Sequence, residues 1–143
     1  MSAELRSIRV LPSWILGKAA DRGRALVAAA LAREGLKVWH HVVLSAVAEL
    51  GPVAQAELVR GVGLDAKDMV GVLNDLQDAG LVVRAPDPHD RRKNAVTVTA
   101  DGRRLLARCE RAARKANDEL LAPLTVVERE LLTSLLTRVS GTG

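Results

Sequence analysis

Apolar side chains recur at helical spacing through most of the chain, and this pattern predicts a mainly helical protein. Gly35 and Gly80 interrupt the pattern, as expected where helices end. Asp65 is the expected N-cap of the fourth helix, and either Thr99 or Asp101 is the expected N-cap of the fifth. The predicted helices cover residues 12–34, 37–50, 54–63, 65–79, 100–121 and 126–138.

Two short extended runs, "LVVRA" at 81–85 and "AVTVT" at 95–99, lie between the fourth and fifth helices. The second run alternates with period two and is rich in branched side chains, so the pair predicts a β-hairpin. The third and fourth helices are joined by a tight turn that contains glycine, which is typical of a helix-turn-helix. A hairpin directly after a helix-turn-helix is a wing, and the predicted fold class is therefore mainly α with a small β-hairpin, a winged helix-turn-helix.

The segment "AELVRGVGLDAKDMVGVLNDLQDAGLVVRAPDPHDRRKNAVTVTADGRRLL", residues 56–106, resembles the MarR family of winged helix-turn-helix transcription regulators. The combination of "DPHDRR" with "TVTADGRRLL" carries the resemblance. The resemblance implies a homodimer whose N- and C-terminal helices interleave. It implies an N-terminal dimerisation helix over 1–36, a DNA-binding domain over 37–99 and C-terminal dimerisation helices over 100–143.

As a function, the resemblance implies a ligand-responsive repressor that binds a pseudo-palindromic DNA operator as a homodimer. The recognition helix would enter the major groove and the wing the minor groove. Arg91, Arg92 and Lys93 place three cations at the tip of the hairpin, where a narrow minor groove concentrates negative potential. The family's D-x-R pattern matches Asp90 and Arg92, which implies that Arg92 enters the groove and that Asp90 orients it or an adjacent cation.

The recognition helix offers few polar groups for contacts with DNA. Its expected outward positions are Ala66, Lys67, Val70, Gly71 and Asn74. Gln55, at the start of the preceding helix, is a further candidate for DNA contact. Lys67 is long enough to reach a phosphate, and Asn74 is expected to read adenine or to contact the DNA backbone. Asp68, Asp75 and Asp78 would repel phosphates if they faced DNA. An alternative is therefore a degenerate winged helix that binds a protein partner and binds DNA weakly or not at all.

Two residues are candidates for binding a small aromatic or phenolic effector: Trp14 and His40. The competing interpretation is that the tryptophans pack in a core that lacks Phe and Tyr. His40 and His41 project about 100° apart on a helix and cannot clamp one metal ion, so we expect no metal site and no cofactor. Cys109 lies on an apolar stripe, where burial makes a thiol inert rather than redox-active.

Composition excludes some classes of protein but does not identify a function. The net charge of +4 is compatible with a polyanionic partner. A single cysteine excludes an intrachain disulfide. No catalytic pairing of nucleophile and base and no phosphate-binding glycine loop is recognisable, so we expect a protein that is not an enzyme. No run has the length of a transmembrane helix or the form of a signal peptide, and we expect a cytoplasmic location without a membrane partner.

Overall fold

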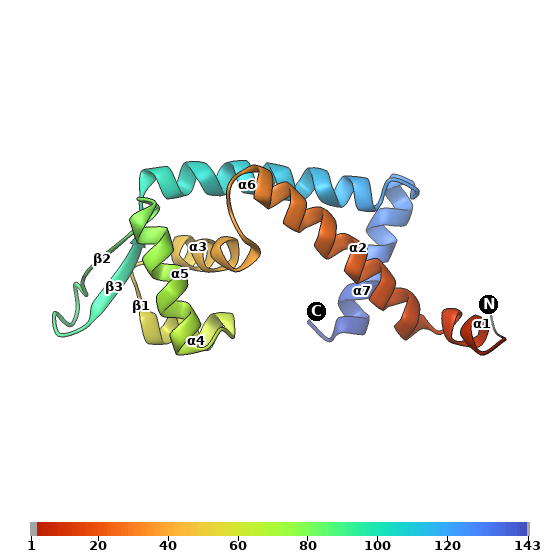
Figure 1. Ribbon diagram of the computed structural model, residues 1–143, viewed down its shortest axis with the longest axis horizontal. Helices are drawn as coiled ribbons and strands as arrows, with labels where there is room; N and C mark the ends of the chain where they lie inside the picture. Colours follow the sequence, from red (N-terminus) through yellow and green to blue (C-terminus); the bar gives the residue numbers. More distant parts are fainter. Residues whose placement is uncertain (1–2, 143) are drawn as a thin grey trace. The chain divides into compact units, whose positions relative to one another are not determined.

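The helical spacing of apolar residues forms seven helices in the computed structural model, which describes residues 3–142 (Figure 1). The helices are α1 (Ala3–Arg9), α2 (Pro12–Arg33), α3 (Val38–Leu50), α4 (Gln55–Val62), α5 (Ala66–Asp78), α6 (Ala100–Leu120) and α7 (Val126–Ser140). The strands are β1 (Val53–Ala54), β2 (Val82–Pro86) and β3 (Asn94–Val98). The six predicted helices are confirmed as α2 to α7, and α1 is an addition that the pattern of apolar residues did not predict.

The described chain divides into two compact units. One comprises residues 28–113, and the other comprises the described residues on either side of that range. The first unit contains α3, α4, α5 and the three strands, and it holds the apolar core. On α5 the spacing i, i+3, i+4 and i+7 buries Met69, Val72, Leu73 and Leu76. α5 packs against α3, whose buried residues include Leu44, and burying each of these α5 side chains contributes about 1.5–3 kcal/mol relative to exposure.

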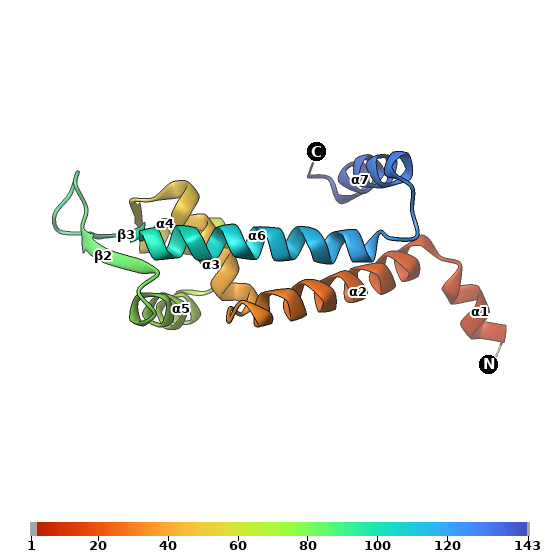
Figure 2. The ribbon, with the colours of Figure 1, turned by 90° about the horizontal axis from the view of Figure 1, so that it is seen from above.

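The sheet has three antiparallel strands in the order β1-β3-β2, where the sequence predicted only a two-stranded hairpin. Val53 of β1 pairs with Val96 of β3, and Arg84 of β2 pairs with Val96 from the other side. The two-residue strand β1 has no periodicity of its own, so its pairing with β3 alone defines it. The loop between β2 and β3 projects away from the helices of this unit in both ribbon views (Figure 2).

Side-chain caps determine where α5 and α6 begin. The Asp65 carboxylate accepts a hydrogen bond from the backbone N–H of Asp68 at 2.7 Å, which confirms the predicted cap. Thr99 rather than Asp101 caps α6, because its hydroxyl oxygen accepts from the backbone N–H of Gly102 at 3.0 Å. The same hydroxyl donates to the carbonyl of Gly80 at 2.7 Å. Thr99 therefore ties the start of α6 to the turn that follows α5.

The second unit contains α1, the first part of α2, the end of α6 and α7. The guanidinium of Arg22 donates to the carbonyl of Leu120 at 3.1 Å, which joins α2 to the end of α6. Thr125 and Glu128 form a capping box at the start of α7. No residue of α7 is buried, although the helix is rich in leucine and valine. None of the helices in the described part of the chain is long and apolar enough to cross a membrane.

Candidate nucleic-acid interface

The helix-turn-helix is formed by α4 and α5, which are joined by a short turn. Gly63 ends α4 with φ of +79°, a conformation that glycine adopts without strain. The five predicted contact residues of α5 are all exposed: Ala66, Lys67, Val70, Gly71 and Asn74. Gln55 is half-buried in the first turn of α4. The exposed face of α5 is thus small and mostly neutral, with Lys67 as its cation.

Arg84 of β2 contacts this face and was missed by the sequence analysis. Its Nη2 donates to the side-chain oxygen of Asn74 at 2.9 Å. Arginine has only donors, so the bonded amide atom must be the oxygen, and the amide NH₂ of Asn74 is left as the free end. The Nε of Arg84 is buried without a hydrogen-bond partner in the described structure. A half-buried strand arginine next to a recognition helix carries no signal in a single sequence that distinguishes it from a solvated one.

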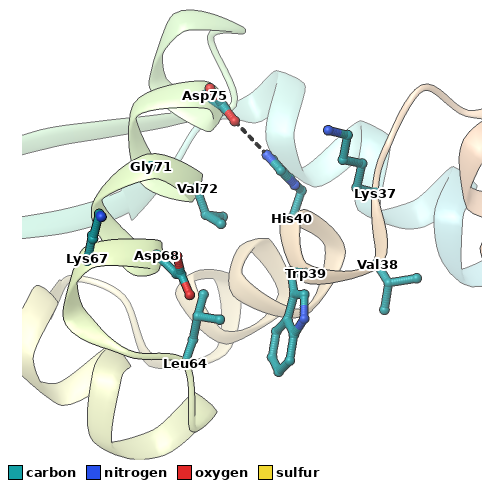
Figure 3. Close-up of a pocket in the computed structure, with 10 residues that line it drawn as sticks. All are labelled: Lys37, Val38, Trp39, His40, Leu64, Lys67, Asp68, Gly71, Val72 and Asp75. Carbon is teal, nitrogen blue, oxygen red and sulfur yellow. Dashed lines mark hydrogen bonds and ion pairs between the residues drawn. The ribbon is translucent and has the colours of Figure 1, made fainter.

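Two aspartates that the sequence analysis identified as a problem for DNA binding lie on the flank of α5 that faces α3 (Figure 3). The Asp75 carboxylate lies 2.9 Å from Nε2 of His40 on α3. Asp68 is seven residues earlier, on the same flank, and its carboxylate points toward Leu64 and Trp39. Asp78 is exposed in the last turn of the helix.

The wing tip, residues 87–93, is closed by its own hydrogen bonds. The backbone N–H of Asp87 donates to the carbonyl of Lys93 at 2.8 Å, and the N–H of Lys93 donates to the carbonyl of Asp90 at 3.0 Å. The Asp87 carboxylate accepts from the N–H of His89 at 2.7 Å. These contacts give the tip a defined conformation without any help from the helices.

Asp90 holds Arg92 through one carboxylate oxygen. That oxygen accepts from the backbone N–H of Arg92 at 3.1 Å and from its Nε at 3.2 Å. The Arg92 side chain is 91% exposed, so its guanidinium stands in solvent at the tip. An exposed pair of this kind contributes at most about 1 kcal/mol to stability, and its main effect is on orientation. Within the described part of the chain, no ion pair engages Arg91 or Lys93.

The two predicted effector residues belong to different units and have different partners. Trp14 lies on α2, where the Nζ of Lys18 is 4.9 Å from the centre of its ring. His40 lies on α3 and lines two cavities of about 470 and 410 Å³. Lys37, His40 and Asp75 line both cavities, so the His40–Asp75 contact lies where the two meet. Trp39, which is not among the predicted site residues, also lines the larger cavity.

Burial changes the chemistry of two further side chains. Burial lowers the pKa of His41 below its ordinary value, and the nearby Glu110 carboxylate offsets part of that change. Burial raises the pKa of the Cys109 thiol, Glu34 raises it further, and Arg108 opposes both effects. The expectation of an inert thiol therefore agrees with its surroundings. Arg108 forms an ion pair with Glu34 at 3.3 Å, so it is not a free cation on α6.

Comparison with known proteins identifies relatives among transcriptional regulators. A family model described as the MarR family matches residues 34–93. A protein described as a transcriptional regulator of the hcr operon in Thauera aromatica is 32% identical over 106 residues, 74% of this chain and 64% of that protein. The chain thus spans slightly less than two thirds of that relative. The HTH-type transcriptional repressor NicR of Pseudomonas putida is 31% identical over 87% of this chain and 79% of its own length.

The HTH-type transcriptional repressor Rv2887 of Mycobacterium tuberculosis is 33% identical over 82% of this chain and 85% of its own length. Its crystal structure in complex with DNA superposes with a TM-score of 0.79 at 29% identity, covering 91% of this chain and 98% of that one. The same repressor has also been solved with p-aminosalicylic acid and with salicylic acid, each with a TM-score of 0.74. The mainly helical fold with a small antiparallel sheet is therefore the winged-helix fold of these regulators.

Proposed function

The chain belongs to the MarR family, and from this premise we propose that it is a transcriptional repressor that binds double-stranded DNA as a homodimer. The observation that carries the proposal is the wing tip, where Asp90 holds the exposed guanidinium of Arg92. A cation presented on a thin hairpin fits a minor groove, and the adjacent α5 fits a major groove.

Exposed apolar side chains on α1, α2 and α7 support the homodimer. Val10, in the turn between α1 and α2, and Val126 and Val127 of α7 are 72%, 70% and 73% exposed, and none of these helices covers them. An apolar surface of this kind marks a protein interface, and a second copy supplies a matching surface by two-fold symmetry. The other exposed large apolar residues of these helices and of the turn between α1 and α2 are Ile8, Leu11, Ile15, Leu16, Leu131, Leu135, Leu136 and Val139.

On the operator, we propose that α5 contacts base edges and that the first turn of α4 contacts phosphate. Two copies related by a two-fold axis require two inverted half-sites about one helical turn apart, which is a pseudo-palindrome. Lys67 would contact phosphate, and the small Gly71 together with Val70 would allow a close approach to the groove. Asn74 would donate through its NH₂ group, because its oxygen accepts from Arg84. Gln55 and Ala66 complete the set of proposed contacts.

The position of the aspartates favours DNA binding over the protein-interaction alternative. Asp75 is engaged by His40, and Asp68 faces Trp39, so neither carboxylate projects from the centre of the exposed face. Asp78 is at the far end of α5 from Lys67 and contributes the remaining repulsion. Because Asp68 and Asp75 lie on the flank, Lys67 and the wing cations would supply most of the proposed electrostatic contacts with DNA.

The test is DNA affinity with a duplex enriched from a random library by the wild-type protein. Arg92→Ala should weaken binding by about 1–3 kcal/mol and lower the salt dependence. Arg111→Ala is the matched control, because it removes the same charge from an exposed position on α6. Equal affinities for wild type and Arg92→Ala at fixed salt would refute the role of the wing. Failure of the library to yield any enriched duplex would favour the protein-interaction alternative.

We further propose that a small aromatic acid regulates DNA binding from the 410 Å³ cavity, whose walls include Lys37, His40, Leu105 and Arg108. Arg108 is paired with Glu34, which also lines the cavity, so Lys37 is the cation that suits a carboxylate, and the relative Rv2887 has been solved with salicylic acid. Trp14, on the other unit, is the second candidate. With salicylate as the probe, the wild-type melting temperature should rise, and His40→Gln should reduce that rise. An unchanged rise in His40→Gln and a lost rise in Trp14→Phe would assign the effector to Trp14 instead.

A further inference from the structure

The larger cavity is a cleft of about 470 Å³ between the first turn of α3 and the flank of α5 (Figure 3). Its volume is in the range of sites for small organic molecules. Apolar side chains form much of its surface: Val38 and Trp39 from α3, Val72 from α5, and Leu64 from the turn before α5. Trp39 is 47% exposed, an unusual position for one of only two tryptophans in the chain. The cleft therefore presents an aromatic surface to solvent beside an apolar floor.

The charges around the cleft are unevenly distributed. Figure 3 shows the Lys67 side chain directed away from the cleft, and Lys37 beside the His40 ring at the end away from Trp39. At that end the Asp75 carboxylate is already engaged by His40. At the other end the Asp68 carboxylate points toward Leu64 and Trp39, and no hydrogen bond or ion pair engages it in the described structure. The end of the cleft near Trp39 thus combines an aromatic ring with an unpaired negative charge.

This combination recognises a cation attached to an apolar body. A positive nitrogen over the Trp39 ring is attracted by the negative face of the ring, and it forms an ion pair with Asp68. The apolar body then covers Leu64 and Val72. A carboxylate at the same place would meet the Asp68 charge and the ring face, and both repel it. We propose that this cleft binds a small amphipathic organic cation, an apolar body that bears one ammonium group.

The position of the cleft gives such a ligand a regulatory consequence. Lys67 and Gly71, two proposed DNA contacts, also line the cleft, so an occupant lies against the helix that would enter the major groove. Ligand and DNA would then compete directly, without a change in the dimer. This consequence rests on the proposed DNA binding, whereas binding of the cation does not. The site adjoins the cavity proposed for an aromatic acid and shares Lys37, His40 and Asp75 with it, but its end near Trp39 selects the opposite charge.

The test uses two probes with the same apolar cage and opposite charges, 1-adamantylammonium and 1-adamantanecarboxylate. Neither probe absorbs or emits with tryptophan, so the emission of Trp39 in a Trp14→Phe variant reports binding without interference. We expect the ammonium to bind about tenfold more tightly than the carboxylate. If Trp14→Phe does not fold, the indole N–H signals of ¹⁵N-labelled wild type report the same titration.

Asp68→Asn should weaken binding of the ammonium about three- to fivefold, since it removes the charge and keeps the shape. Asp78→Asn is the control, because it removes a charge from the same helix outside the cleft. Carboxylate binding as tight as ammonium binding, no response of Trp39 to either probe, or equal affinities in Asp68→Asn and wild type would each overturn the proposal.

A second arm measures release of the enriched DNA duplex by 1-adamantylammonium. Release from wild type at lower concentrations than from Asp68→Asn supports direct competition, and a ternary complex of protein, probe and DNA overturns it. If the protein binds no duplex while Trp39 still responds to the ammonium, the proposed function fails and the cation site stands. The two failures are therefore distinguishable.

Discussion

Gly102 joins the wing to the long helix α6, and replacing it with alanine should destabilise the fold. It is the third residue of α6 and is buried. A Cβ atom at this position would lie 2.3 Å from the carbonyl oxygen of Leu81 and 2.7 Å from a methyl carbon of Val98. The first of these neighbours is backbone, which cannot rotate away. Alanine therefore forces the start of α6 away from the sheet.

The expected magnitude has two parts. Overpacking against fixed neighbours costs about 1–3 kcal/mol. The same carbonyl of Leu81 accepts the backbone hydrogen bond of Thr99 at 3.0 Å, and losing that bond adds about 0.5–1.5 kcal/mol. Gly102→Ala should therefore lower the free energy of unfolding by about 1.5–4.5 kcal/mol.

The control is glycine to alanine at position 71, where the expected change in the free energy of unfolding has the opposite sign. A Cβ atom at Gly71, in the exposed middle of α5, would have nothing within 4 Å. Gly71→Ala should raise the free energy of unfolding by about 0.5–1 kcal/mol, because alanine is the better helix former. Urea unfolding at one fixed protein concentration measures both, since the stability of a dimer depends on concentration. A urea midpoint of Gly102→Ala equal to or above that of wild type would refute the packing argument.

Three other outcomes follow from individual side chains. Since burial lowers the pKa of His41, the unfolded chain binds protons more readily than the folded chain below about pH 6.5, so the free energy of unfolding should fall on acidification through that range. In urea unfolding, His41→Leu should flatten this pH dependence. An equal fall in wild type and His41→Leu would contradict the reasoning. Cys109 should react with a thiol reagent slowly in the native protein and rapidly in urea, because burial raises its pKa; fast native reaction would show an accessible thiolate. Arg84→Ala and Asn74→Ala should each weaken DNA binding, and in a double-mutant cycle their effects on the binding free energy should be coupled by more than about 0.5 kcal/mol. If the two losses of binding free energy simply add in the double variant, Arg84 does not position Asn74.

Local patterns along the chain predicted most of the helices and strands. The spacing of Met69, Val72, Leu73 and Leu76 is a property of consecutive turns, so it predicted both α5 and its buried face. Asp65 caps α5 through the backbone of Asp68, only three residues later, and such short-range chemistry is visible in sequence. The order of helices and strands then indicated the winged helix-turn-helix.

Part of the candidate site was predictable for the same reason. Asp90 and Arg92 are two residues apart, and the tight turn that holds them is local. The partners of Asn74 and Asp75 were not predictable. Arg84 approaches Asn74 from a strand, and His40 approaches Asp75 from a helix 35 residues earlier. These contacts decide which polar groups of α5 are engaged within the chain.

The amino-acid sequence by itself determined α2 to α7, the hairpin, the cap of α5 and the cationic wing, because each depends on residues within a few turns of one another. Only the tertiary structure decided that β1 joins the sheet, that the amide oxygen of Asn74 is engaged by Arg84, and that Asp68 and Trp39 share a cleft. These contacts join residues far apart in the chain. Such pairs leave no periodic pattern, and packing of the elements brings them together.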